Sequence, residues 1–330
     1  MQLNKSIKFF LNYFLGPVLF VVLAFSIYQQ IIHQPQLEET WHNIRQSFFS
    51  GNFVYIVFAV LLIAVNWGLE AWKWMLLVNN IRPVRFLQAY KAVLSGVSFS
   101  VALPNRVGEY LGRMLYMPPG SKLKTISATI VGSMAQLIIT LVTGFFGLVI
   151  IHAQLLKQYP RFFIWYYFIA YGVLFYLIVL LFLYFNVRGG VALIKRWVKA
   201  RKYLYLVESL GNFNSAFLVR LLLISFVRYL VFLLQYLLIF KAFEVDVSIT
   251  NLTLVMSVVF LALAVIPSVA LIEIGLRGEI SLKLLGIFTL NSLGVGLTTI
   301  AVWFLNLIIP ALIGSLFLLN IKLTNKNVSD

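Results

Sequence analysis

The chain has 330 residues, of which 62% are hydrophobic and 11% are charged, and its formal net charge is +16. A soluble core of this length does not need so much apolar surface, so the composition predicts a polytopic membrane protein. The absence of cysteine excludes disulfides and thiolate metal sites, and His33, His42 and His152 fall in expected loops or helix ends, which argues against a metal site.

Six apolar segments are long enough to cross a hydrocarbon core of about 30 Å as helices. They cover residues 9–32, 53–78, 123–151, 161–186, 215–243 and 288–319. The first follows Lys5 and Lys8, but it is too long for the apolar part of a signal peptide and no small-residue cleavage site follows it. We therefore expect it to be retained as a span.

Two further apolar stretches, residues 86–118 and 249–286, are each interrupted by a proline and then become charged. The polar residues after the breaks at Pro104 and Pro267 are Arg106, Gly108, Glu109 and Arg113 in the first stretch and Glu273, Arg277 and Glu279 in the second. Broken backbone and charge cannot face lipid and need protein or water around them. We therefore predict two re-entrant helical hairpins.

Lysine and arginine are concentrated in alternate loops, which predicts the side of the membrane on which each loop lies. The pattern places both termini in the cytoplasm of a multi-pass protein of the cell membrane, and it argues against nucleic acid as the partner. Segment 187–212, with six basic residues between 188 and 202, is expected to be a cytoplasmic loop. Because aromatic residues interleave with these charges, an interfacial helix that binds anionic lipid headgroups is the alternative.

With six crossings, the first hairpin enters from the cytoplasm and the second from the outside. The sequence thus predicts an all-α fold with one transmembrane domain over residues 1–330 and an inverted repeat. Residues 53–151 form the first repeat with the cytoplasmic-side hairpin 86–118, and residues 215–319 form the second with the outer-side hairpin 249–286. The two halves match in the order of their elements and not residue by residue.

Charged residues within the expected spans are informative because a charge at the bilayer centre costs about 2.5–3.5 kcal/mol. Asn66, Glu70 and Lys73 share one helix face, so Glu70 and Lys73 can form a structural ion pair. Alternatively, Glu70 faces Arg106 and Arg113 of the first hairpin.

Arg228 lies near the middle of span 215–243, with Gln235 on the same face, and is expected to face the interior of the bundle. Its partner is either a hairpin carboxylate, Glu109 or Glu279, or the phosphate of a substrate, which suits the planar guanidinium.

The charges of the two hairpins also allow two interpretations. Glu109 and Arg113 are four residues apart on one helical stretch and can form an ion pair that stabilises the hairpin. Alternatively, arginines bind a headgroup phosphate and glutamates bind an amine, with Glu273, Arg277 and Glu279 acting from the other side.

Small and hydroxyl residues form two weaker stripes that indicate helix packing or a polar path. One includes Ser133, Gln136, Thr140, Thr143, Gly144 and Gly147, and the other includes Asn291, Thr298 and Asn306.

The segment Leu103-Pro104-Asn105-Arg106-Val107-Gly108-Glu109, followed by Arg113, resembles the hallmark of flippase-like membrane proteins related to the transmembrane part of lysylphosphatidylglycerol synthases. Asn66-Trp67, Trp72-Lys73-Trp74, Ile266-Pro267 and Glu273-Ile274-Gly275 are similar to further parts of that pattern, and the resemblance covers residues 9–319. It implies movement of aminoacylated phospholipid between leaflets and marks Arg106, Glu109, Arg113, Glu273 and Glu279 as site candidates.

Two features depart from the family. The run after Pro267 is Ser268-Val269-Ala270-Leu271 where the family has glycines, and no synthase domain lies within residues 1–330. We therefore expect that the chain does not make the lipid and that its substrate need not be lysylphosphatidylglycerol.

Together these features predict translocation of a polar or phosphate-headed lipid, whose headgroup passes through a polar cavity while its acyl chains stay in the bilayer. No enzymatic role, cofactor or metal is expected. The candidate headgroup residues are Arg106, Glu109, Arg113, Arg228, Glu273, Arg277 and Glu279, supported by Glu70, Lys73, Pro104, Gly108 and Pro267.

One alternative is an ion- or proton-coupled transporter of a small anionic solute. A membrane-embedded transferase is disfavoured because no histidine or pair of aspartates falls within the spans.

Overall fold

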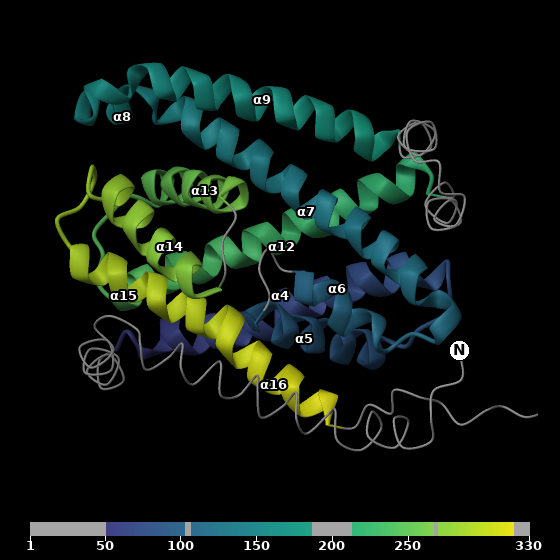
Figure 1. Cartoon of the computed structure of the whole chain (residues 1–330). Coiled ribbons are helices and arrows are strands. Elements are labelled where there is room, and N and C mark those ends of the chain that lie inside the picture. The colour runs from purple at the N-terminus through teal and green to yellow at the C-terminus, as the bar shows by residue number, and fades with distance from the viewer. Residues whose placement is uncertain (1–50, 103–106, 187–212, 267–269, 320–330) are drawn as a thin grey trace, which may run out of the picture.

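The computed structural model describes residues 51–102, 107–186, 213–266 and 270–319. The expected first span at 9–32 and the basic segment 187–212 lie outside this part of the chain. So do Pro104, Arg106 and Pro267. Every regular element within the described ranges is helical (Figure 1), in agreement with the predicted all-α class.

Five of the described helices are long and apolar enough to cross a membrane. Four of them are α4 (Phe53–Asn79), α7 (Lys122–Ile150), α9 (Phe163–Phe185) and α12 (Ser215–Ala242). The fifth is continuous through α15 (Ser292–Trp303), the π-helical turn η5 (Phe304–Ile308) and α16 (Ile309–Leu318). These helices correspond to the expected spans that begin at residues 53, 123, 161, 215 and 288.

Both predicted breaks separate helices. Helix α5 (Phe86–Ala102) ends before Pro104, and α6 (Val107–Met114) begins after it. In the same way, α13 (Ile249–Val265) and α14 (Ala270–Leu285) flank Pro267. We refer to α5 and α6 as the first pair and to α13 and α14 as the second pair. The remaining elements, η2 (Pro119–Ser121), α8 (His152–Gln158) and η3 (Pro160–Phe162), are short connections.

Residue chemistry explains several helix ends. The side chains of Asn214, Ser248 and Asn291 accept hydrogen bonds from backbone N–H groups in the first turns of α12, α13 and α15, as N-cap residues do. In the fifth span, Pro310 has no N–H to donate, and just before it the Ile309 N–H bonds to the Phe304 carbonyl, five residues back. A proline that interrupts the helical ladder thus accompanies the π-turn.

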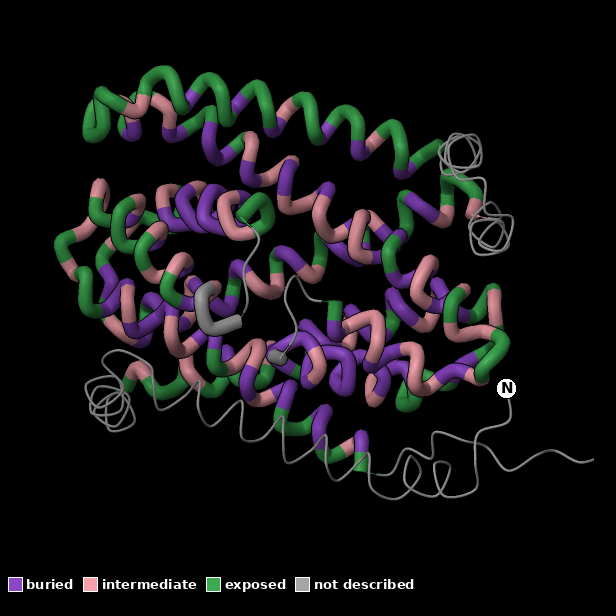
Figure 2. Tube along the Cα trace, in the orientation of Figure 1, coloured by how far each residue is buried: buried purple, intermediate pink, exposed green. Residues whose placement is uncertain are grey.

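The two pairs occupy different parts of the bundle. The first pair packs with α4 and α16, whereas α13 packs on α7 and α14 packs on α15. Helix α12 contacts α4, α7 and α15 and thereby links the two parts. Helix α9 lies against α7 with a long exposed face (Figures 1 and 2), which consists mainly of large apolar side chains and is suited to contact with lipid.

Glycines allow the closest backbone approaches in the first pair. A Cβ atom at position 108 would lie 2.1 Å from the carbonyl carbon of Phe99, and one at position 112 would lie 2.5 Å from the Cα of Gly96. Any larger residue would therefore force α5 and α6 apart, as is typical of small-residue contacts between membrane helices. Gly108 was predicted to help break the helix, and in the structure it lies within α6 and serves this contact.

Candidate functional site

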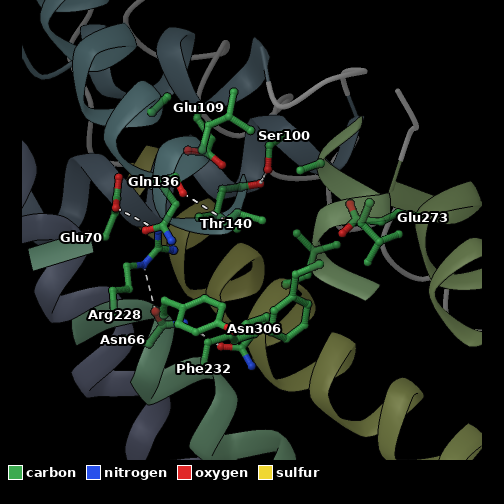
Figure 3. Close-up of a pocket in the computed structure, with 18 of the residues that line it drawn as sticks. Asn66, Glu70, Ser100, Glu109, Gln136, Thr140, Arg228, Phe232, Glu273 and Asn306 are labelled. Carbon is green, nitrogen blue, oxygen red and sulfur yellow. Dashed lines mark hydrogen bonds and ion pairs between the residues drawn. The ribbon is translucent and has the colours of Figure 1, made fainter. Parts of the chain in front are cut away.

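A cavity of about 500 Å³ lies where the two pairs face each other. Its walls come from both pairs and from α4, α7, α12 and the α15–η5 segment. The polar side chains that line it are Asn66, Glu70, Lys73, Ser100, Glu109, Tyr110, Ser133, Gln136, Thr140, Arg228, Tyr229, Glu273, Arg277 and Asn306. Figure 3 shows Glu70, Gln136 and Arg228 together at one side of this cavity and Glu273 at the other.

Glu70 of α4 lies at the centre of an ion-pair network. Its Oε2 atom lies 2.8 Å from Lys73 Nζ and 2.9 Å from a terminal nitrogen of Arg228, and its Oε1 atom lies 3.0 Å from a terminal nitrogen of Arg113. The predicted Glu70–Lys73 contact is therefore present, and Glu70 also reaches the first pair through Arg113. Lys73 additionally donates to Ser225 Oγ over 3.4 Å. One carboxylate thus connects α4, α6 and α12.

Arg228 is held by amides as well as by Glu70. Its Nε atom donates to Asn66 Oδ1 over 2.9 Å, and a terminal nitrogen lies 3.4 Å from Gln136 Oε1. Its guanidinium lies 5.2 Å from the centre of the Trp67 ring, a distance at which a cation is attracted to the ring face. Asn66 in turn donates to Asn306 over 2.9 Å. These contacts fix the guanidinium at the cavity wall.

The structure corrects the expected partner of Arg228. Glu70 of α4 is the carboxylate that it contacts within the described residues, and neither Glu109 nor Glu279 forms an ion pair with it. Gln235 shares the face of Arg228, as expected, because both side chains bond to α4. Its amide is buried against α4 and donates to the Ala59 carbonyl over 2.9 Å.

The first pair brings a second carboxylate to the cavity. Glu109 Oε2 lies 2.8 Å from Arg113 at the predicted four-residue spacing. Arg113 therefore bridges two carboxylates, and its side chain is only 2% exposed. Arg106, the remaining candidate of this pair, lies outside the described residues.

The second pair contributes a further group of charges. Glu273 and Arg277 form an ion pair one turn apart on α14, and both line the cavity. A terminal nitrogen of Arg277 donates to the Tyr236 hydroxyl of α12 over 2.8 Å. Burial of Arg277 is thus balanced by one carboxylate and one neutral acceptor, as a buried cation requires.

Glu279 lies elsewhere. Its side chain is 61% exposed and pairs with Lys283 one turn later on α14 over 2.7 Å. It does not line the cavity. Of the candidate headgroup residues that the structure describes, Glu109, Arg228, Glu273 and Arg277 line the cavity, and Arg113 lies directly behind it.

Two contributors to the site were not identified from the sequence. Tyr236 is next to Gln235, and only its bond to Arg277 distinguishes it from the other aromatic residues of α12. Trp303 lines the cavity just before the π-turn, and its indole N–H has no partner among the described residues. Asn306, by contrast, belongs to a polar stripe that the sequence does show.

No group of three or more histidine, cysteine, aspartate or glutamate side chains within the described residues could hold a metal ion. The charged groups of the cavity instead form carboxylate–cation contacts that reach across four helices. Such an arrangement can bind a charged or strongly polar group inside a membrane, where isolated charges are costly.

The family model described as "Lysylphosphatidylglycerol synthase TM region" matches residues 13–314. The matched range includes every helix of the cavity wall. No curated protein matches the chain.

Proposed function

Because the chain belongs to the family of the lysylphosphatidylglycerol synthase transmembrane region, we propose that it moves a polar or phosphate-headed lipid between the two leaflets of the cell membrane. The match and the five apolar helices make it a multi-pass membrane protein, and the family has a membrane lipid-related function. In this proposal the charged cavity residues bind and release the headgroup, and no bond of the lipid is made or broken.

The proposed arrangement has six crossings, with residues 9–32 as the first and both termini in the cytoplasm. The first and second pairs are re-entrant hairpins that enter from the cytoplasmic and outer sides in an inverted repeat. Helix lengths support this arrangement. Helix α6 has 8 residues and spans about 12 Å at 1.5 Å per residue, which is much less than the hydrocarbon thickness.

One observation carries the proposal: charged side chains of both pairs line the same cavity between the membrane helices. Glu109 belongs to the first pair, and Glu273 and Arg277 belong to the second. In an inverted repeat the two pairs enter from opposite sides, so a headgroup in this cavity is within reach of either leaflet. Polar residues in such positions mark substrate pathways in membrane proteins.

The rim of the cavity favours a lipid over a soluble ion. The end of α13 contributes Val265 and Ile266 to the lining, and these residues are 54% and 40% exposed. An apolar, exposed edge beside a charged interior suits a molecule whose headgroup enters the protein while its acyl chains remain in the bilayer.

Leaflet exchange in proteoliposomes tests the proposal with purified protein and labelled anionic, zwitterionic and aminoacylated lipids. We expect headgroup-selective exchange that falls about tenfold or more in Glu109→Gln and in Glu273→Gln, because a charged contact contributes about 1.5–3 kcal/mol. Glu279→Gln is the matched control for Glu273→Gln. It removes the same charge from the same helix outside the cavity, and exchange should be unchanged.

Thermal unfolding of each variant must accompany the assay, since removal of one partner leaves a buried charge unpaired. Exchange that is lost only in unfolded variants would contradict the role of the cavity. Absence of exchange with every lipid, with and without a proton gradient, would favour an ion- or proton-coupled transporter of a small anionic solute.

A further inference from the structure

Positive charge is concentrated on one side of the cavity. Beside α4, the carboxylate of Glu70 contacts Lys73, Arg113 and Arg228, and Glu109 is the second carboxylate of this network. On the opposite side, Arg277 is paired with Glu273. Among the described residues, three cations therefore face two carboxylates beside α4, and a ligand that binds there gains by carrying negative charge.

The accessible cation in this group is Arg228. Its side chain is 15% exposed, whereas those of Arg113 and Lys73 are 2% and 1% exposed. Arg228 lines the cavity together with Gln136 and Asn66, to which it is hydrogen-bonded. Glu70 acts as a positioning residue, because it holds the guanidinium over 2.9 Å and is itself paired with Lys73.

The unpaired polar atoms of the cavity wall also favour a ligand that accepts hydrogen bonds. Three lining side chains have a buried nitrogen without a described partner: Nε1 of Trp67, Nε1 of Trp303 and Nε of Arg277. All three atoms are N–H donors. Gln235 Oε1, a buried acceptor without a partner, belongs to a side chain that does not line the cavity. Because an unpaired buried donor is unfavourable, a ligand whose acceptor atoms reach these nitrogens would be stabilised by them.

We propose that the cavity binds the phosphate group of an anionic lipid, with Arg228 and the Trp67 and Trp303 indoles as its donors and without requiring an amine in the headgroup. The inference rests on the proposed function and names the substrate class of that site. Phosphate oxygens accept hydrogen bonds and match the planar donor fork of arginine. The indole N–H group supplies a neutral donor that adds no charge to the membrane interior.

Isothermal titration of the full chain in detergent tests this with a matched pair of short-chain ligands. Dihexanoylphosphatidic acid and dihexanoylglycerol carry the same acyl chains and differ in the phosphate. We expect the phosphatidic acid to bind at least about tenfold more tightly, since hydrogen bonds to charged groups contribute about that factor. Inorganic phosphate should compete only weakly, because it lacks the acyl chains.

Variants assign the donors. Arg228→Gln should weaken binding of the phosphatidic acid about tenfold or more, and Arg228→Lys should weaken it less because the charge remains. Trp303→Phe keeps an aromatic ring and removes the N–H group, so it should weaken binding severalfold. This variant provides a second test in case Arg228→Gln does not fold. Its matched control is Trp74→Phe, because the Trp74 N–H donates to Thr129 Oγ1 over 3.1 Å and Trp74 does not line the cavity.

Equal affinities for the two short-chain ligands, or affinities that do not change in either cavity variant, would overturn the inference. Inorganic phosphate that binds as tightly as the phosphatidic acid would support a phosphate site but overturn its assignment to a lipid. Phosphate-dependent binding without leaflet exchange would overturn the proposed function and leave the phosphate site standing. Leaflet exchange of lipids without phosphate, in the absence of phosphate-dependent binding, would support the proposed function and overturn the phosphate site.

Discussion

The two helix pairs carry similar charges but are held in the bundle in different ways. In the first pair, backbone contacts at Gly108 and Gly112 join α6 to α5, and Arg113 joins it to Glu70 of α4. In the second pair, Gly275 and Gly278 have open space around them, and the pair Glu273–Arg277 lies within α14 with Tyr236 as a neighbouring acceptor. The first pair is thus fastened as a unit. In the second pair α13 lies closely against Gly144 and Gly147 of α7, whereas α14 has room to shift.

This difference suggests a division of labour within the proposed transport cycle. The first pair and α4 maintain a fixed positive wall, which keeps the phosphate donors in place. We propose that α14 is the part that moves, because Glu273 and Arg277 offset each other's charge within this helix. Three predictions can break or sharpen this comparison.

The largest effect is expected from Glu70→Gln. The substitution removes the carboxylate shared by Lys73, Arg113 and Arg228, and uncompensated buried charges destabilise a protein by about 3–5 kcal/mol. Thermal unfolding in detergent should show a large decrease in melting temperature. Glu279→Gln is the control, because exposed ion pairs contribute at most about 1 kcal/mol. Equal shifts in the two variants would show that Glu70 does not hold the wall together.

The next effect concerns backbone contact. Gly108→Ala places a methyl group against the Phe99 backbone and should destabilise the fold by about 3 kcal/mol. Gly278→Ala is the matched substitution in the second pair. It meets no atom within 4 Å and should leave the melting temperature unchanged or raise it slightly, since alanine favours a helix over glycine by about 1 kcal/mol. A melting temperature that falls equally in both variants would contradict the comparison.

The smallest effect is expected from Tyr236→Phe. Arg277 loses one acceptor and keeps Glu273, so unfolding should become easier by about 1–3 kcal/mol. Lipid exchange should also change, because Arg277 lines the cavity. In Tyr184→Phe a buried tyrosine loses a hydrogen bond to the Leu218 carbonyl, away from the cavity. Tyr184→Phe should lower stability and leave exchange intact. Loss of exchange in Tyr184→Phe would show that exchange falls with any loss of stability.

Local patterns were sufficient to predict much of the fold. Span lengths follow from hydropathy, and both breaks follow from prolines that cannot continue a helix. The pairs Glu70–Lys73 and Glu109–Arg113 follow from spacings of three and four residues, which place side chains on one helix face. Each of these features is set by residues that are close in the sequence.

Contacts between distant elements could not be predicted in this way. Arg228 and Glu70 are 158 residues apart, and their meeting depends on how α4 and α12 pack. The difference between Glu273 and Glu279, however, is visible in helical geometry. Glu279 lies two residues after Arg277, and two residues turn an α-helix by about 200°. Glu279 therefore points away from the face that Glu273 and Arg277 share.

The π-turn η5 has a consequence for how the two pairs are connected. A π-turn holds one residue more than an α-turn, and one residue corresponds to about 100° of rotation. Helix α15 contacts α14, and α16 contacts α5, so a single membrane helix touches both pairs on either side of this offset. The extra residue therefore determines how far the face of α15 that contacts α14 is rotated from the face of α16 that contacts α5. A chain with one residue deleted from Phe304–Ile308 would keep almost the same hydropathy, but its two halves would be turned out of register.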